Sequence, residues 1–190
     1  MGATAAEKAD NTGPLEKRMV SKNWSVRANA YEELTKMCLD SERNSKADFF
    51  RAHACEFKVY LKDVNPGALE KCLTCLNAFL DKVHKTIISE AQNDIISMLV
   101  EKCLGHAKPV IKDKSKECLL LMFEVSENFE DCVETLQGLA SHKNIKVSKL
   151  LLKTHFSLFR CLPVEHWLWP TSWRTSVTRK SEFQITQSRC

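Results

Sequence analysis

The sequence has few of the residues that turn-rich β folds require. Its 190 residues include only five glycines, five prolines and two tyrosines, whereas tight turns depend on glycine and proline and strands are enriched in aromatic and β-branched side chains. It also has no apolar run near the about eighteen residues of a membrane span, and no apolar signal segment at its start. We therefore expect a single all-α domain in the cytoplasm, with no membrane partner.

A strongly basic face is missing as well. The formal net charge is +4, and residues 171–190 contribute +3 of it, because they hold four basic residues and one glutamate. The rest of the chain is close to neutral, whereas a phosphate-binding face concentrates lysine and arginine on one surface of the fold. We expect no nucleic-acid partner.

The sequence has none of the common catalytic motifs: no Ser/His/Asp set, glycine-rich phosphate loop, HExxH or paired carboxylates. Cys72 and Cys75 form a CxxC motif, but no second pair follows at zinc spacing and no strand precedes it. They fall on the same helical stripe as Leu69 and Leu76, which predicts core packing. Metal or redox chemistry is the alternative, and we expect no metal, no cofactor and no enzymatic activity.

What the sequence does contain is a repeating plan of two amphipathic helices joined by a short polar break. The breaks recur every 36 to 42 residues, at 21–24, 63–67, 105–109 and 141–144, a spacing typical of HEAT repeats. Each unit has an apolar face that only its neighbours can cover. One such stripe consists of Leu69, Cys72, Leu73, Leu76, Phe79, Leu80 and Val83. We predict a HEAT-like helical-hairpin solenoid of about four repeats with an irregular C-terminal tail.

The breaks also have the chemistry of helix starts. Asn65 precedes Pro66 as an N-cap precedes the first helical residue, where the missing N–H of proline costs nothing. Pro109 occupies a similar place, and Asn23 and Asn144 are candidate caps for the other two breaks. In a helical-hairpin solenoid such breaks lie along one edge, so their residues should be presented as a line.

This predicted line combines one exposed aromatic residue with recurring cations. Its members are Trp24, Arg27, Val64, Asn65, Pro66, Lys108, Lys112, Lys143 and Lys146. Tryptophan and arginine are favoured interface anchors, and lysines steer an acidic partner. The line therefore predicts a binding surface for an acidic protein. The alternatives are that Trp24 only fills a gap between two helices and that each lysine is simply solvated.

The residues of the first unit resemble a known family. The opening repeat of a TOG domain, the tubulin-binding module of microtubule polymerases, is similar to PLEKRMVSKNWSVRANAYEELTKM. The second, third and fourth repeats are similar to NPGALEKCLTCLNAFLDKV, KCLGHAKPVIKDKSKECLLLMFEV and GLASHKNIKVSKLLLKTHFSLF. The resemblance runs from about residue 14 to residue 159, and its first repeat is the most specific part.

The resemblance implies a monomeric module that binds the αβ-tubulin dimer and contributes to growth at the microtubule plus end and to spindle organisation. The cytoplasm and cytoskeleton, including the spindle and the centrosome or spindle pole, are the implied locations. Carried over by position, the contacts are Trp24 in the first loop, Val64 and Asn65 in the second, Lys108 and Lys112 in the third, and Lys143 and Lys146 in the fourth. Arg27 is either a contact or a helix-internal salt-bridge partner. A generic HEAT-repeat scaffold without preference for tubulin is the alternative.

The resemblance ends near residues 159–162. A complete TOG domain is similar to six HEAT repeats, whereas the segment that follows here, PVEHWLWPTSWRTSVTRKSEFQITQSRC, does not resemble a fifth. We expect a flexible N-terminus at 1–12, the TOG-like domain at 13–162 and a disordered tail at 163–190. A chain truncated in this way should bind tubulin more weakly than a full module, because one end of the contact line is missing.

Overall fold

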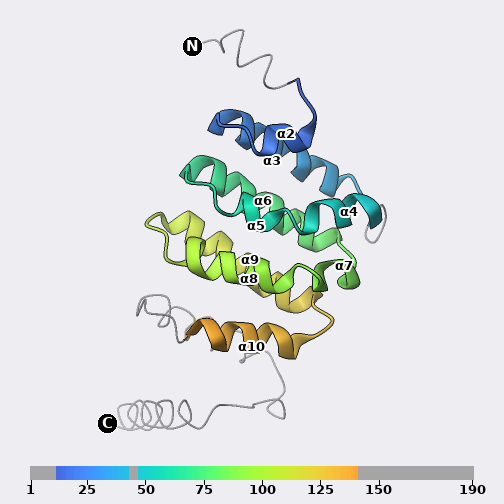
Figure 1. The fold of residues 1–190 in the computed structure, drawn as a ribbon, viewed down its shortest axis with the longest axis vertical. Helices are drawn as coiled ribbons and strands as arrows, with labels where there is room; N and C mark the ends of the chain where they lie inside the picture. Colours follow the sequence, from blue (N-terminus) through green and yellow to red (C-terminus); the bar gives the residue numbers. More distant parts are fainter. Residues whose placement is uncertain (1–11, 43–46, 141–190) are drawn as a thin grey trace, which may run out of the picture. The chain divides into compact units, whose positions relative to one another are not determined.

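The described part of the chain is a stack of antiparallel helix pairs (Figure 1). The computed structural model describes residues 12–42 and 47–140, and every element within those ranges is helical. The helices are Leu15–Met19 (α2), Trp24–Leu39 (α3), Ala47–Ala54 (α4), Phe57–Tyr60 (α5), Pro66–Lys82 (α6), Lys85–Ser89 (α7), Gln92–Met98 (α8), Leu99–Leu104 (the π-helical η1), Pro109–Val125 (α9) and Phe129–Ala140 (α10). None of these helices is long and apolar enough to cross a bilayer.

The helices form two layers, as a HEAT-like solenoid requires. The second helix of each unit packs on the next, α3 on α6 and α6 on α9, while α5 packs on α8 and α8 on α10. Each layer thus covers the apolar face that a single helix pair leaves open. The predicted all-α, HEAT-like fold is confirmed.

The first helices of the second and third units differ from the prediction, because each is divided. The second unit has α4 and α5 where one helix was expected, and the third unit has α7 followed by α8 and η1. The divisions pack in register, since α7 contacts α4 and α8 contacts α5. The divided helices therefore match each other across the repeat boundary.

The centre of the core is an aromatic cluster between α4, α5 and α6. Phe79 lies 5.2 Å from Phe50 and 4.9 Å from Phe57, measured between ring centroids, in edge-to-face geometry. All three side chains are fully buried. The apolar stripe predicted between residues 69 and 83 is buried along its whole length, as the helical spacing indicated.

Cys72 and Cys75 lie in this core, which confirms the packing predicted for them. Both are free thiols with no exposed surface. Burial raises the pKa of both thiols above the ordinary value, so the reactive thiolate is disfavoured. Within residues 12–42 and 47–140, no group of side chains is arranged to hold a metal ion.

Two predicted segments cannot be compared with the structure. The expected flexible N-terminus at 1–12 lies outside the described residues except for its last position, and the expected tail at 163–190 lies outside them entirely. The domain boundaries at 12–13 and 162–163 therefore remain predictions.

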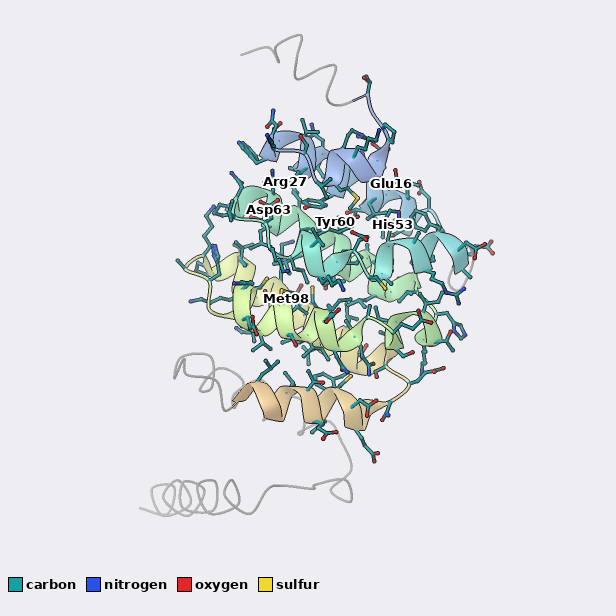
Figure 2. The ribbon with its side chains drawn as sticks, viewed as in Figure 1. Glu16, Arg27, His53, Tyr60, Asp63 and Met98 are labelled. Carbon is teal, nitrogen blue, oxygen red and sulfur yellow. The ribbon has the colours of Figure 1, made fainter. Side chains whose placement is uncertain are left out.

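His53 is a buried titratable group at the junction of the first and second units. Its side chain is 4% exposed and lies edge-on against Phe49, with ring centroids 5.0 Å apart. Burial lowers the pKa of His53, and the carboxylates of Glu16 and Glu56 oppose that shift only in part. Figure 2 shows Glu16 of α2 beside His53 of α4. The folded state therefore favours the neutral imidazole.

This shift predicts a dependence of stability on pH. The unfolded state should protonate His53 near its ordinary pKa of about 6.5, whereas the folded state does so only at lower pH. The free energy of unfolding should thus be highest above about pH 6.5 and fall as the pH drops through the lowered folded pKa. Urea unfolding at about pH 7 and about pH 5 measures this loss. His53→Gln should lose less stability than the wild type over that interval, and equal losses would exclude His53 as the cause.

Candidate functional site

Three loops within the helix pairs lie along one edge of the stack (Figure 1). Loop 1 spans residues 20–23, between α2 and α3; loop 2 spans 61–65, between α5 and α6; loop 3 spans 105–108, between η1 and α9. Helices α4 and α7 lie at the opposite edge. We call the surface of loops 1, 2 and 3, with the first turn of the helix that follows each, the loop edge. The fourth predicted loop, with Lys143 and Lys146, lies outside the described residues.

Loop 1 presents Trp24 at the first position of α3. Asn23 caps the helix, because its side-chain oxygen accepts a hydrogen bond from the Ser25 amide at 3.0 Å. The Trp24 side chain is 50% exposed. One part of its ring is close to α6, since a Cβ added at Gly67 would lie 3.6 Å from Cζ3 of Trp24. Trp24 therefore lies close to the start of α6 and still leaves half of its surface to solvent.

Arg27, one turn further along α3, joins loop 1 to loop 2. Its Nε donates to Oδ2 of Asp63 at 2.6 Å and its Nη2 donates to Oδ1 at 2.7 Å. Its Nη1 donates to the backbone oxygens of Ser21 and Lys22 at 2.7 and 3.1 Å. Hydrogen bonding to Asp63 raises the pKa of Arg27. We call this pair, labelled in Figure 2, the Arg27–Asp63 clasp.

The clasp changes the expectation for Arg27. Its partner lies 36 residues away in the next unit, so the predicted alternative of a salt bridge within the helix is wrong. The Arg27 side chain is 15% exposed and that of Asp63 is 1% exposed. With four hydrogen bonds already made inside the protein, the guanidinium is a structural group of the edge, and its contact with a partner stays a prediction.

Loop 2 turns its residues alternately inward and outward. Oδ1 of Asp63 accepts from the Asn65 amide at 2.9 Å, and Oδ1 of Asn65 accepts from the amides of Gly67 and Ala68 at 2.9 and 3.2 Å. The predicted cap at Asn65 is therefore present, and its carbonyl oxygen is committed to the helix start. Val64, between these two anchored residues, is 91% exposed. Loop 2 thus offers Val64 as its main outward side chain.

Loop 3 ends at Lys108, which directly precedes the proline that begins α9. The Lys108 side chain is exposed and makes no capping bond, whereas Lys112 in the first turn of α9 is half-buried. Between them, Val110 is 48% exposed and Ile111 is buried. Of the two lysines predicted for this loop, Lys108 is therefore the more accessible.

Two further lysines belong to the loop edge and were not among the predicted site residues. Lys22 in loop 1 and Lys62 in loop 2 are both exposed. The only carboxylate in loops 1, 2 and 3 is Asp63, and Arg27 neutralises it in the clasp. The accessible charge of the three loops is therefore positive, and unpaired surface charges of one sign attract a partner of the opposite sign.

A short pattern in the sequence would have found these lysines. Each loop has a lysine two residues before an exposed apolar side chain, as in Lys22 and Trp24, Lys62 and Val64, and Lys108 and Val110. Protein interfaces combine an apolar core with a polar, solvent-accessible rim. The loop edge is therefore suited to an acidic protein surface that also has apolar contacts.

Comparison with known proteins agrees with this architecture. The family model described as XMAP215/Dis1/CLASP, TOG domain matches residues 10–167. Centrosomal protein 224 of Dictyostelium discoideum is 34% identical over 125 residues, which is 66% of this chain and 6% of that protein. Protein mini spindles of Drosophila melanogaster is 28% identical over 136 residues, which is 70% of this chain and 6% of that protein. The chain thus spans about 6% of the length of these relatives.

One solved structure is also similar to this chain in fold and in sequence. It describes tubulin recruitment and assembly by microtubule polymerases with tumor overexpressed gene domain arrays. It superimposes with a TM-score of 0.67 at 25% sequence identity. The match covers 75% of this chain and 30% of that chain.

Proposed function

Because this chain belongs to the XMAP215/Dis1/CLASP family of TOG domains, we propose that it is a non-enzymatic module that binds the αβ-tubulin dimer through its loop edge. The observation that carries the proposal is the exposure of Trp24 and Val64 on an edge whose accessible charge is positive. Support also comes from the similar array of domains, whose structure concerns tubulin recruitment.

The exposure of each side chain on the loop edge suggests its role in binding. Tryptophan carries more binding energy than most side chains when its exposed area is removed from water, so Trp24 is the anchor. The lysines of loops 1, 2 and 3 increase the association rate with an acidic partner and make binding sensitive to salt. Arg27 and Asn65 support the edge from within, because their side chains are hydrogen-bonded to its backbone.

We further propose that this module acts in the cytoplasm at growing microtubule plus ends and in the spindle. Its similarity to proteins named for the centrosome, the spindle and the spindle pole body supports that location. A single module should bind free tubulin as a monomer without acting as a polymerase, because linked modules gain avidity that one module lacks. In a longer relative, several linked edges would supply that avidity.

Size-exclusion chromatography of the whole chain with purified αβ-tubulin tests the proposal. We expect co-elution at low salt and less of it at physiological salt, because exposed charges are screened over about 8 to 10 Å at such salt concentrations. Lys108→Glu should weaken co-elution more than Lys85→Glu. Both lysines are exposed, and Lys85 lies at the start of α7 at the opposite edge. Because each variant replaces one lysine by glutamate, the two have the same net charge and differ only in where the charge is changed.

Two outcomes would contradict the proposal. If the folded chain fails to co-elute at either salt concentration, it is not a tubulin-binding module in this form, and a HEAT scaffold for another partner becomes the better account. If Lys108→Glu and Lys85→Glu weaken binding equally, the interaction depends on net charge and not on the loop edge.

A further inference from the structure

We propose that Ser25 is a phosphorylation site, at which a phosphate group changes the loop edge from a surface that attracts an acidic protein to one that repels it. The effect on tubulin binding rests on the proposed function. The acceptance of the phosphate rests on residues of this chain alone, so the two can fail separately.

The hydroxyl of Ser25 differs from the other serine hydroxyls in its hydrogen bonding. Within residues 12–42 and 47–140, the Ser25 hydroxyl makes no hydrogen bond to the chain. Every other serine hydroxyl in those ranges makes one, namely those of Ser21, Ser41, Ser89, Ser97, Ser115 and Ser126. Phosphorylation of Ser25 therefore breaks no side-chain hydrogen bond of the fold.

Ser25 also stands in a sequence that a protein kinase can recognise. It is half-buried in the first turn of α3, and the exposed Lys22 stands three residues before it. Kinases select substrates partly by charge, and one class prefers a basic residue three positions before the serine. Ser21 and Ser115 also follow a basic residue at this spacing. However, Ser115 is buried, and so is Arg18, the basic residue before Ser21.

The phosphoryl transfer needs ATP and a kinase from outside the chain. Oγ of Ser25 forms a bond to the γ-phosphorus of ATP, the bond from that phosphorus to the bridging oxygen breaks, and ADP leaves. The hydroxyl proton passes to the catalytic base of the kinase. The product has a phosphate group of about −1.5 to −2 charge at pH 7.

The fold should tolerate this charge. α3 begins at Trp24, so Ser25 is the second residue of the helix, and the first turn of α3 holds no acidic residue. Negative charge in a first turn is favourable, because the free backbone N–H groups of a helix point toward it. The phosphorylated chain is therefore expected to stay folded.

The same charge opposes the binding of an acidic partner. Ser25 directly follows Trp24, the proposed anchor, and Lys22 is the only basic residue in loop 1. Because Asp63 already neutralises Arg27, a phosphate makes the charge of loop 1 and the first turn of α3 negative. A partner that covers Trp24 would bring its own carboxylates close to this phosphate, and like charges in an interface are strongly unfavourable.

The first test asks whether Ser25 accepts the phosphate. The whole chain is incubated with ATP and a serine kinase that prefers a basic residue three positions before its target, and the modified residues are identified by mass spectrometry. We expect phosphate at Ser25, and at least about tenfold less of it in Lys22→Ala. A reaction that fully modifies a standard peptide substrate but leaves Ser25 unmodified would overturn the proposal.

The second test asks whether charge at this position controls binding. Ser25→Glu and Ser25→Gln have nearly the same shape and differ in charge. Ser89→Glu adds the same charge to α7 at the opposite edge. After circular dichroism shows that each variant is folded, its affinity for αβ-tubulin is measured at low salt. We expect Ser25→Glu to bind at least about tenfold more weakly than Ser25→Gln, and Ser89→Glu to bind like the wild type.

Two further results would count against the proposal. Equal affinities of Ser25→Glu and Ser25→Gln would show that charge at this position does not control binding. An unfolded Ser25→Glu variant would show that the first turn of α3 does not tolerate the charge. If the wild type itself does not bind tubulin, the proposed function fails, and mass spectrometry still decides whether Ser25 accepts the phosphate.

Discussion

Trp24→Ala is expected to weaken binding to αβ-tubulin by about 2 kcal/mol or more, which is a loss of about thirtyfold or more in affinity. The side chain is 50% exposed, so half of its surface is available to a partner. Anchors of this kind dominate binding energy because they remove a large apolar area from water in one place. Titration of the chain into αβ-tubulin with a fluorescence or calorimetric readout measures the change.

Leu39→Ala is the matched control for this experiment. Leu39 ends α3, the helix that Trp24 begins, and it is 58% exposed. The two variants therefore each remove one exposed apolar side chain from opposite ends of one helix. The account predicts that only Trp24→Ala loses affinity and that both remain folded by circular dichroism. A folded Trp24→Ala variant with wild-type affinity would show that this tryptophan only packs against α6.

Phe79→Ala is expected to lower the free energy of unfolding by about 3 to 5 kcal/mol. Phe79 is fully buried and meets Phe50 and Phe57 in edge-to-face contacts, so the substitution leaves a cavity where three elements meet. Domains commonly have only about 5 to 15 kcal/mol of stability in total. Urea unfolding followed by circular dichroism measures the loss.

Phe49→Ala provides the comparison for Phe79→Ala. Phe49 lies in α4 next to Phe50 but is only half-buried. Its removal should therefore cost clearly less, because the vacated space opens to solvent and part of its area was never buried. Equal losses for the two variants would mean that the aromatic cluster around Phe79 is not the centre of the core.

The sequence predicts the solenoid well because its signals are local and periodic. Cys72, Leu76 and Phe79 recur at helical spacing and are all buried in α6. Asn65 and Pro66 stand next to each other, so the helix start they form needs no knowledge of the rest of the fold. Helical period and capping chemistry are properties of a few consecutive residues, which is why they can be identified from the sequence alone.

The candidate site is less predictable because its key contact is not local. Asp63 stands in the second break, and nothing near it in the sequence indicates that its partner is Arg27, 36 residues earlier. Only the stacking of two units brings the guanidinium and the carboxylate together. The same stacking decides that Arg27 supports the edge from within while Val64 faces outward.

Lys22 and Lys62 were missed for a different reason. A lysine in a polar break is usually solvated, so neither residue stands out by itself. Their significance appears when the structure places loops 1, 2 and 3 on one edge. The only carboxylate in these loops, Asp63, is buried and paired with Arg27, so it does not offset the charge of the two lysines. The charge of the edge is therefore a property of the assembled repeats.

Hydrogen exchange of the whole chain with and without αβ-tubulin is the most direct test of the central claim, which is that the loop edge binds tubulin. The account predicts slower exchange in residues 20–23, 61–65 and 105–108 when tubulin is present, with unchanged exchange in Lys85–Ser89 at the opposite edge. Protection confined to α4 and α7, or the absence of protection in all three loops at a tubulin concentration that saturates binding, would contradict it.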